Sequence, residues 1–458
     1  MEATEISRLK TTQKHFFNTG KTKPYEVRVE SLKKLEASIR SYEPQIFEAL
    51  AKDLGKSETE SYISEIAFLY EEIRFALKHL KKWMKPKRVS TPFTQWPAKS
   101  YLYLEPLGSV LIIAPWNYPF QLVMSPLIGA IAAGNCAVLK PSELSTHTSR
   151  LIEEIIAKTF PKEHVAVVLG GIETSQALVA QPWDHLFFTG GTEIGRKVMT
   201  EAAKTLTPVT LELGGKSPCL VDSDTDWEVT AKRIVWGKFF NAGQTCVAPD
   251  YLLLPKGSTE QFIPLLKATI ESFFSKTPEK SPDYGRIVSQ GQYERLKKYL
   301  RSGKVALGGI YKDEERFIAP TVLTELSWQD DVMKEEIFGP ILPVLEYESL
   351  EQAIGQIQSR PKPLALYYFS KDEEKTREVL KRISFGGGCI NDTLVHLANP
   401  KLPFGGVGES GLGKYHGKYS FDTFSHEKSV VKRSFWLDLA LRYPPYLDHI
   451  KIFRKLMR

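Results

Sequence analysis

The sequence is poor in cysteine and has no long apolar run. Its four cysteines are Cys136, Cys219, Cys246 and Cys389. None forms a Cys-x-x-Cys pair or stands at metal-ligand spacing from a histidine, so we expect neither a disulfide framework nor a metal site, and we expect a reducing, cytoplasmic location. The apolar stretches at 109–114 and 122–133 are interrupted well short of the roughly 20 residues that span a bilayer, and the N-terminus lacks the apolar core of a secretory signal. We therefore expect neither a transmembrane segment nor export.

The sequence also lacks a strong excess of one charge. It has 61 Lys and Arg against 54 Asp and Glu, a net charge of +7, and the charges are interspersed. This mild bias favours anionic small ligands such as a dinucleotide, and without an arginine-rich arm we expect no nucleic-acid partner. The 42% of hydrophobic and 25% of charged residues are typical of globular proteins and argue against a disordered chain. At 458 residues the chain is long enough for two or more domains.

The hydrophobic pattern predicts an α/β protein with two parallel sheets. Apolar residues recur at helical spacing from 25 to 80, and a Pro-containing basic stretch at 85–99 follows as a connector or protruding arm. From 101 to 211 short apolar runs alternate with helical patterns, and a second series of the same kind covers 216–391. Such alternation predicts parallel strands with helices on both faces. A glycine cluster at 403–413 is interpreted as a folded loop near a site.

Cys246 is the first candidate for chemistry. It closes the segment 241–246 (NAGQTC), directly after a predicted helix. A nucleophilic thiol needs access and small neighbours, which Gly243 provides. Taken alone, however, a single cysteine is more often an ordinary buried residue, so its context has to decide.

Two further segments supply that context. Glu212 ends an apolar strand and is followed by two glycines, a place where a carboxylate can activate a water. It precedes Cys246 by one predicted strand and one helix, so both groups can reach the same crevice at the carboxyl edge of a sheet. Asn117 follows the predicted strand 110–113 and can donate its amide to an oxyanion, although a turn-forming role between two prolines is an alternative.

A third pattern indicates a phosphate-binding turn. Gly190, Gly191 and Gly195 lie between a predicted strand and a helix, so a phosphate would meet a helix N-terminus. The glycine spacing departs from the usual G-x-G-x-x-G, and alone the signal is weak.

Together these segments resemble the aldehyde dehydrogenase superfamily, and within it the class 3 branch, over residues 22–442. The shared motifs, in order, are PWN at 115–117, KPSE at 140–143, FTGG at 188–191, ELGG at 212–215, GQTC at 243–246 and EIFGP at 336–340. The class 3 likeness rests on the glycine cluster at 403–413, on YHGK at 415–418 and on RYPPY at 442–446.

The resemblance implies a fold of two Rossmann-like parallel-sheet domains with a small oligomerisation arm, and a homodimer. In residue ranges it implies a cofactor-binding domain at 1–84 and 101–210, a catalytic domain at 211–395, oligomerisation or bridging segments at 85–100 and 396–430, and a C-terminal tail at 431–458. That tail mixes apolar and basic residues, which is compatible with weak contact to a membrane surface or with packing on a partner subunit.

The resemblance also assigns roles to residues. Cys246 is implied as the nucleophile, Glu212 as the general base, and Asn117 with the Cys246 backbone N–H as the oxyanion hole. The implied cofactor is NAD, with NADP possible: a carboxylate at Glu143 suits ribose hydroxyls but repels a 2′-phosphate, which Lys140 would attract. The implied cofactor-binding set is Trp116, Lys140, Glu143, Gly190, Gly191, Gly195, Leu213, Gly214, Glu336 and Phe338.

The expected reaction is oxidation of an aldehyde to its carboxylic acid through a thiohemiacetal and a thioester on the cysteine. The expected substrates are medium or long aliphatic or aromatic aldehydes. Aromatic side chains near the motifs would line an apolar tunnel that suits such substrates. The expected substrate-contacting residues are Tyr118, Trp236, Asn391 and Phe404. A CoA-acylating dehydrogenase is one alternative, against which Glu212 speaks. A binding protein without turnover is another, which the intact set of three catalytic candidates disfavours.

Overall fold

The first series of apolar runs forms a six-stranded sheet. The structure, a computed structural model, describes residues 3–446 and 449–456. The strands are β3 (Ser109–Ile113), β4 (Cys136–Lys140), β5 (Val165–Val167), β6 (His185–Thr189), β7 (Val209–Glu212) and β17 (Gly411–Leu412). Their order is β17-β7-β6-β3-β4-β5, and every neighbouring pair is parallel except β17 with β7. Strands β3, β4 and β6 are buried along their whole length, as expected for a sheet covered on both faces.

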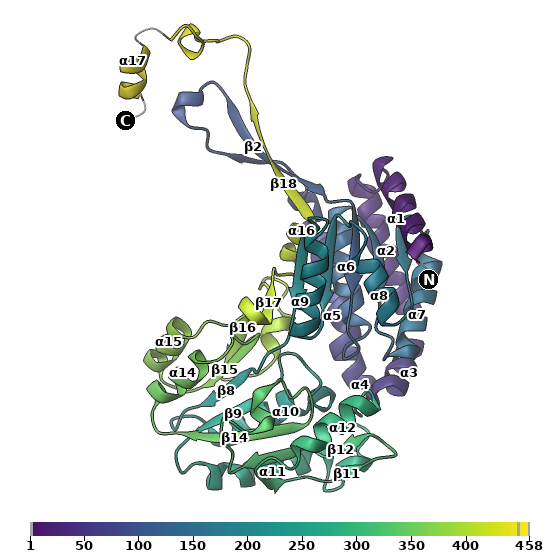
Figure 1. Cartoon of the computed structure of the whole chain (residues 1–458), viewed down its shortest axis with the longest axis vertical. Coiled ribbons are helices and arrows are strands. Elements are labelled where there is room, and N and C mark those ends of the chain that lie inside the picture. The colour runs from purple at the N-terminus through teal and green to yellow at the C-terminus, as the bar shows by residue number, and fades with distance from the viewer. Residues whose placement is uncertain (1–2, 447–448, 457–458) are drawn as a thin grey trace.

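Helices cover both faces of this sheet (Figure 1). They are α1 (Ala3–Asn18), α2 (Tyr25–Ser41), α3 (Glu43–Leu54), α4 (Glu58–Ser61), α5 (Ala67–Trp83), α6 (Gln121–Ala133), α7 (Thr146–Thr159), α8 (Ile172–Val179), α9 (Thr192–Ala203) and α16 (Lys418–Thr423), with a π-helix, η1 (Tyr62–Ile66), between α4 and α5. Helices α1, α8 and α9 contact one face, whereas α6 contacts the other with α2, α5 and α16 packed behind it. Helix α6 is therefore buried all round, which explains its uniformly apolar sequence.

Two hydrophobic cores follow from this layering. Alternate residues of β3 point to opposite faces: Val110 and Ile112 belong to the larger core, whereas Leu111 and Ile113 belong to the smaller one under α1, α8 and α9. The larger core continues through the second sheet.

The second series of apolar runs forms a seven-stranded sheet of order β10-β13-β14-β9-β8-β15-β16. Its strands are β8 (Pro218–Val221), β9 (Tyr251–Pro255), β10 (Lys304–Leu307), β13 (Thr321–Thr324), β14 (Ile341–Tyr347), β15 (Ala365–Phe369) and β16 (Gly387–Ile390), and only β10 is antiparallel to its neighbour. Around it lie α10 (Trp227–Phe239), α11 (Thr259–Phe274), α12 (Gln290–Tyr299), α13 (Asp331–Lys334), α14 (Leu350–Gln358), α15 (Glu373–Arg382) and the hairpin of β11 (Tyr311–Lys312) and β12 (Phe317–Ile318). The predicted α/β class with two parallel-sheet units is confirmed.

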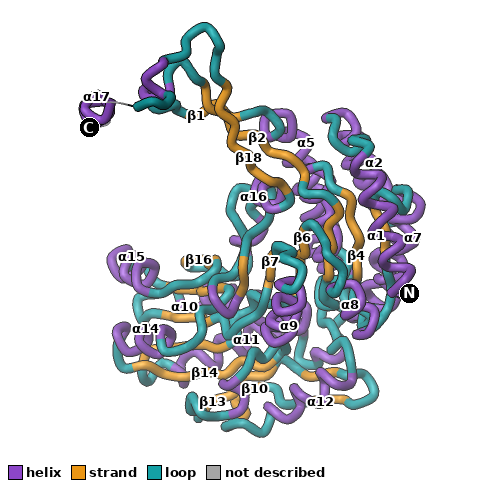
Figure 2. The backbone as a smooth tube through the Cα atoms, turned by 45° about the horizontal axis from the view of Figure 1, so that its top comes forward, coloured by secondary structure: helices purple, strands orange, loops and turns teal. Residues whose placement is uncertain are grey.

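A three-stranded antiparallel sheet projects from the body as an arm, visible in Figures 1 and 2. It joins β1 (Lys87–Val89), β2 (Lys99–Pro106) and β18 (Ser425–Lys432). The chain beyond the arm ends in α17 (His449–Leu456). Residues 447–448 and 457–458 of the predicted C-terminal tail lie outside the described residues.

The structure divides the segment expected at 396–430 between two places. Only its last residues, from Ser425, join the arm, while Gly411–Leu412 add an edge strand to the first sheet. The reason is backbone pairing: the glycine cluster lies against β7, where Leu213 N donates to Ser410 O at 3.1 Å. Among the described residues, none of the helices is long and apolar enough to cross a bilayer.

Candidate functional site

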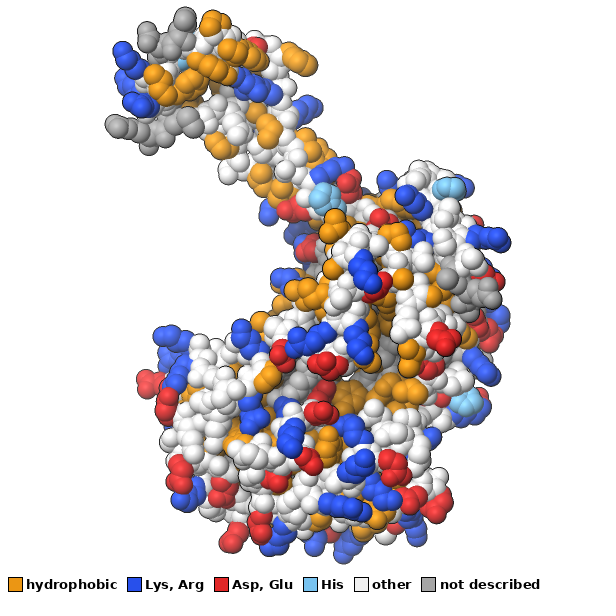
Figure 3. Space-filling view, viewed as in Figure 1, with side chains coloured by type: hydrophobic (Ala, Val, Ile, Leu, Met, Phe, Trp, Pro, Cys, Tyr) orange, Lys and Arg blue, Asp and Glu red, His pale blue; other side chains and the backbone are white. Residues whose placement is uncertain are grey.

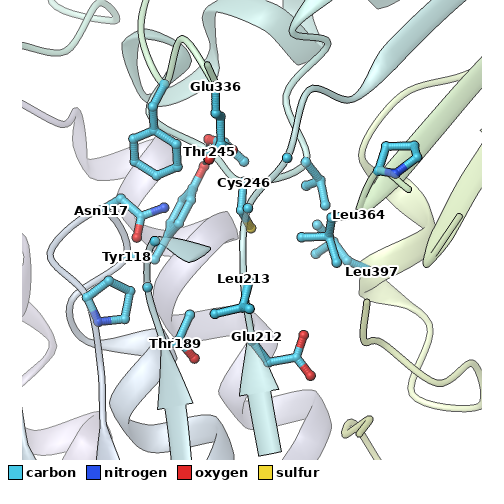
Figure 4. A pocket seen from close by; sticks show the side chains of 18 of the residues that line it. Asn117, Tyr118, Thr189, Glu212, Leu213, Thr245, Cys246, Glu336, Leu364 and Leu397 are labelled. Atoms are coloured by element: carbon cyan, nitrogen blue, oxygen red, sulfur yellow. Dashed lines mark hydrogen bonds between the residues drawn. The ribbon is translucent and has the colours of Figure 1, made fainter. Parts of the chain in front are cut away.

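A cavity of about 890 Å³ lies between the two sheets. Glu212 and Thr189, the last residues of β7 and β6, line it from the first sheet, and Cys246 lines it from the loop after α10. In Figure 4 the Cys246 side chain lies between Asn117 on one side of the cavity and Leu364 on the other, above Glu212. The cavity thus brings together Asn117 and Glu212 from the carboxyl edge of the first sheet and Cys246 from the loop before β9 of the second sheet.

A set of hydrogen bonds holds the Cys246 loop. Asn241 and Ala242 adopt left-handed backbone angles, with φ of 53° and 52°, directly after α10. The buried Gln244 side chain then donates to Asn241 O at 3.1 Å and accepts from Val288 N at 3.0 Å. These bonds fix the loop, and the Cys246 side chain stays half-buried at the cavity surface.

The surroundings of Cys246 favour the neutral thiol. Burial raises its pKa to about 12, and the carboxylates of Glu336 and Glu212 act in the same direction. The backbone N–H groups of Cys246 and Val247 oppose this shift. The thiol is therefore protonated at neutral pH, and any reaction of it as a nucleophile requires the loss of that proton.

Glu212 is fully desolvated. Neither of its carboxyl oxygens accepts a hydrogen bond from the described residues, and burial raises its pKa well above the ordinary value. Desolvation therefore favours the neutral carboxyl group over the carboxylate. Once ionised, such a desolvated carboxylate is a stronger base than an exposed one and is suited to take a proton from a water.

Asn117 is held at the other side of the cavity. Its Nδ2 donates to Gln244 O at 3.0 Å, and the second hydrogen of this amide remains for another acceptor. Its neighbour Tyr118 shares a 2.6 Å hydrogen bond with the Thr245 hydroxyl. Both bonds connect the Asn117 loop to the segment that carries Cys246, so the amide and the sulfur are positioned by one network.

The turn after β6 offers a phosphate site. Gly190 and Gly191 line the cavity, and Gly191 caps α9 without a side-chain acceptor, so amides of the first helical turn lack intrahelical partners. A Cβ at Gly191 would meet no atom within 4 Å. Gly195 does not line the cavity; a Cβ there would lie 2.5 Å from the Leu213 side chain. Its contribution is therefore close packing of α9 on the sheet.

Glu336 lies directly over Gly214. A Cβ at Gly214 would overlap the Glu336 carboxyl group, so any larger residue here would have to displace that group. Burial, helped by Asp250, raises the pKa of Glu336 to about 8. Trp116 and Phe338 stand beside it with ring centroids 5.2 Å apart. This cradle of a polar carboxyl group, free glycine backbone and two aromatic rings fits the polar ribose and flat ring of a dinucleotide.

Lys140 and Glu143 lie apart from the lining residues, at and after the carboxyl end of β4. Their side chains form a 2.6 Å ion pair in which Lys140 is buried and Glu143 is partly exposed. Burial raises the pKa of Glu143, but the hydrogen bond from Lys140, a backbone N–H and the charge of Lys140 together outweigh it and leave the pKa below its ordinary value. An ionised carboxylate therefore stands on the same sheet edge as the phosphate turn.

Three of the four predicted substrate residues line the cavity: Tyr118, Trp236 and Phe404. Asn391 does not, which corrects the prediction for this residue. Its amide exchanges two 2.8 Å hydrogen bonds with the backbone of Ser370, and this pairing holds the ends of β15 and β16 together.

Sequence reasoning missed other lining residues. Ile63 and Phe68, which the helical pattern assigned to a scaffold helix, line the cavity from η1 and α5. Leu394, Leu397 and His416 do so from the loops after β16 and β17. No local signal identifies them, because ordinary amphipathic or loop sequences contain the same residue types. The wider turn of a π-helix is likewise invisible in the sequence pattern.

Comparison with known proteins agrees with this geometry. A profile described as the aldehyde dehydrogenase family matches residues 2–430. The 4,4'-diaponeurosporen-aldehyde dehydrogenase of Staphylococcus aureus is 52% identical over 96% of this chain and 97% of its own length. Human aldehyde dehydrogenase family 3 member B1 is 47% identical over 94% of this chain and 92% of its own. A solved structure described as the substrate-bound state of Staphylococcus aureus AldH superposes with a TM-score of 0.97, at 50% identity and 99% coverage of both chains.

The glycine under Glu336 leads to a first prediction. In Gly214→Ala the new methyl group displaces the Glu336 carboxylate, so we expect the Kd for NAD+ to rise by at least about tenfold. Titration calorimetry measures this. Gly291→Ala is the matched control, because a Cβ at that helical position meets nothing within 4 Å. If Gly214→Ala bound NAD+ with an affinity within twofold of wild type, the cradle would not be part of the dinucleotide site.

The desolvated thiol leads to a second prediction. Below its pKa a thiol gains about a tenfold larger thiolate fraction per pH unit, so alkylation of Cys246 by iodoacetamide should accelerate by that factor per unit from pH 6 to pH 9. Stopped reactions analysed by mass spectrometry give the rate. Cys246→Ala supplies the background from the other three cysteines. If the alkylation rate instead reached a plateau below pH 9, the pKa of Cys246 would not be raised as the structure indicates.

Proposed function

The chain belongs to the aldehyde dehydrogenase family, and from that premise we propose how its site works. It is an NAD(P)-dependent enzyme that oxidises aldehydes to carboxylic acids. The proposal adds a covalent route through Cys246. The observation that carries it is the meeting of Cys246, Glu212 and Asn117 in one cavity with the cradle formed by Gly214 and Glu336.

In the first step the Cys246 thiol gives its proton to a water, and the resulting thiolate attacks the carbonyl carbon of the aldehyde. A carbon–sulfur bond forms, and the π electrons of the carbonyl move to its oxygen to give a thiohemiacetal. The free hydrogen of the Asn117 amide and the backbone N–H of Cys246 stabilise this oxyanion. In other enzymes a donor of this kind contributes about 3 to 4 kcal/mol.

The second step converts the thiohemiacetal into a thioester on Cys246. Bound NAD(P)+ supplies the acceptor for the hydride that leaves the former aldehyde carbon. The amides at the start of α9, Glu336 and Phe338 would hold the cofactor in the cavity that also contains the Cys246 sulfur.

In the third step Glu212 takes a proton from a water whose oxygen attacks the thioester carbon. The carbon–sulfur bond breaks, the thiolate leaves, and the carboxylic acid is released. The full burial of the carboxyl group supports this role, because it makes the ionised form basic. A base beside the thioester also favours hydrolysis over transfer to CoA.

The proposed cofactor preference is NAD over NADP. The ionised Glu143 beside Lys140 supports it, since a carboxylate accepts ribose hydroxyls and repels a 2′-phosphate. The proposed substrates are medium or long aliphatic or aromatic aldehydes. The apolar lining of the cavity by Trp236, Phe404 and Phe68 supports this class.

We also propose a cytoplasmic homodimer. The exposed aromatic residues of the arm support an interface, because they are apolar surface that a partner subunit would cover: Phe93, Trp96, Phe435 and Trp436. Apolar and basic side chains gather around this end of the molecule in Figure 3. The exposed Ile450 and Ile452 beside basic residues of α17 also support weak contact with a membrane surface. An unpaired nucleophilic thiol fits a reducing compartment.

Hydrolysis by Glu212 can be tested by trapping the thioester. Glu212→Gln should accumulate acyl-enzyme and lower kcat by about 10²- to 10⁴-fold, because its amide cannot take a proton from water. Intact-protein mass spectrometry after mixing with hexanal and NAD+ reports the adduct. Cys246→Ala is the control and should bind NAD+ normally without forming an adduct. If Glu212→Gln turned over at the wild-type rate, Glu212 would not be the general base.

The substrate class can be tested with a panel of aldehydes from acetaldehyde to decanal, benzaldehyde and a phosphorylated aldehyde, each with NAD+ and NADP+. If apolar side chains surround the aliphatic part of the bound aldehyde, kcat/KM should rise about fourfold for each methylene that is buried. This factor corresponds to about 0.8 kcal/mol. NADH or NADPH absorbance gives the rates. A preference for the phosphorylated aldehyde, or a rate that requires CoA, would contradict the proposed chemistry.

A further inference from the structure

A buried ion pair lies behind the Asn117 loop, outside the lining of the cavity. Lys56 Nζ stands 2.5 Å from Glu65 Oε1, and both side chains are fully buried. Lys56 follows α3 in a short connection, whereas Glu65 belongs to the π-helix η1. Neither residue lines the cavity, so neither touches a substrate or cofactor bound there.

The lysine contacts the backbone of the residue proposed to bind the oxyanion. Lys56 Nζ donates to Asn117 O at 3.1 Å and stands 4.1 Å from the centroid of the Tyr118 ring. The Asn241 amide donates to the same Asn117 oxygen at 2.8 Å. The carbonyl group of Asn117 is therefore fixed by two donors, and its peptide plane sets where the side-chain amide can point.

The glutamate holds the following residues. Glu65 Oε2 accepts from the backbone N–H groups of Phe120 and Gln121, at 2.9 and 3.0 Å. These are the first amides of α6, which have no acceptor within the helix. One carboxylate oxygen thus engages Lys56 and the other caps α6, so the pair spans the loop from Asn117 to Gln121.

Such a pair is not needed for stability alone. Desolvation of two charges offsets most of their attraction, and apolar residues of similar volume often stabilise a fold as well or better. A buried pair with every hydrogen bond made does define a geometry, because the charged partners tolerate little displacement. Here that geometry is the backbone of the Asn117 loop.

We propose that Lys56 and Glu65 are positioning residues for oxyanion stabilisation: they hold the Asn117 peptide so that its amide meets the oxygen of the tetrahedral intermediate on Cys246. The inference rests on the proposed function of Asn117 and Cys246.

The test compares two reactions of the Cys246 thiol in cofactor-free protein. Acylation by p-nitrophenyl acetate forms a tetrahedral oxyanion before p-nitrophenolate leaves, whereas alkylation by iodoacetamide displaces iodide without any oxyanion. In Lys56→Met the acylation rate constant should fall by at least about tenfold, and alkylation should stay within about twofold of wild type. Lys56→Gln keeps a donor for both partners and should retain acylation within about threefold. Equal slowing of both reactions by Lys56→Met would overturn the proposal.

A double-mutant cycle with Asn117→Ala tests the route of the effect. If the pair acts through Asn117, adding Lys56→Met to the Asn117→Ala variant should lower the acylation rate constant by less than about twofold. If Lys56→Met slows acylation as much in the Asn117→Ala variant as in the wild type, the proposal is overturned, although Asn117 remains the donor to the oxyanion. Wild-type acylation by Asn117→Ala would instead refute the proposed oxyanion role itself, so the two failures are distinguishable.

Folding is controlled separately. Val379→Ala removes buried volume in α15, far along the chain from the loop, and serves as a destabilised variant whose acylation and alkylation should both be unchanged. Glu65→Gln is combined with Asn117→Ala in the same way, as a second test of the ion pair. If Lys56→Met, Lys56→Gln and Glu65→Gln all fail to fold while Val379→Ala folds, the pair supports the fold and the positioning proposal is overturned.

Discussion

Desolvation at the meeting of two sheets is the constraint on which the site depends. The cavity opens at the carboxyl edge of the first sheet, where Glu212 is buried and Cys246 is half-buried. Burial then raises the pKa of Cys246 and of Glu212, so the surroundings favour the neutral form of both groups. Donors that are already in place can stabilise developing charge without a reorganisation of their surroundings.

Those donors are organised by backbone geometry more than by side chains that touch the substrate. The segments around Asn117 and Cys246 bind to each other through Gln244 O and through the Tyr118 and Thr245 hydroxyls. Further hydrogen bonds connect both segments to structures behind the cavity. The cofactor side follows the same principle, since Glu336 is placed by the absence of a side chain at Gly214. In each case a close backbone approach defines where a polar atom lies.

Much of this could be predicted from the sequence, because the informative residues stand in short motifs at strand ends. The α/β class follows from alternating periods, and parallel strands bring their carboxyl ends to one edge. That places Glu212 at the crevice, whereas Cys246 precedes β9 of the second sheet and is brought to the same crevice by the tertiary structure. Asn391 shows the limit of such reasoning: its polar side chain also follows a strand, yet its amide is used to pair β15 with β16.

The sequence by itself therefore determined the family resemblance and the fold class and indicated the candidate catalytic residues, since local patterns and motifs carry that information. Only the tertiary structure decided which side chains surround the reactive atoms. The π-helix that turns Ile63 into the cavity, the division of residues 396–430 between the first sheet and the arm, and the pair of Lys56 with Glu65 all depend on contacts between segments far apart in the chain. A residue's neighbours along the chain do not specify such contacts, because they arise from the simultaneous packing of several elements.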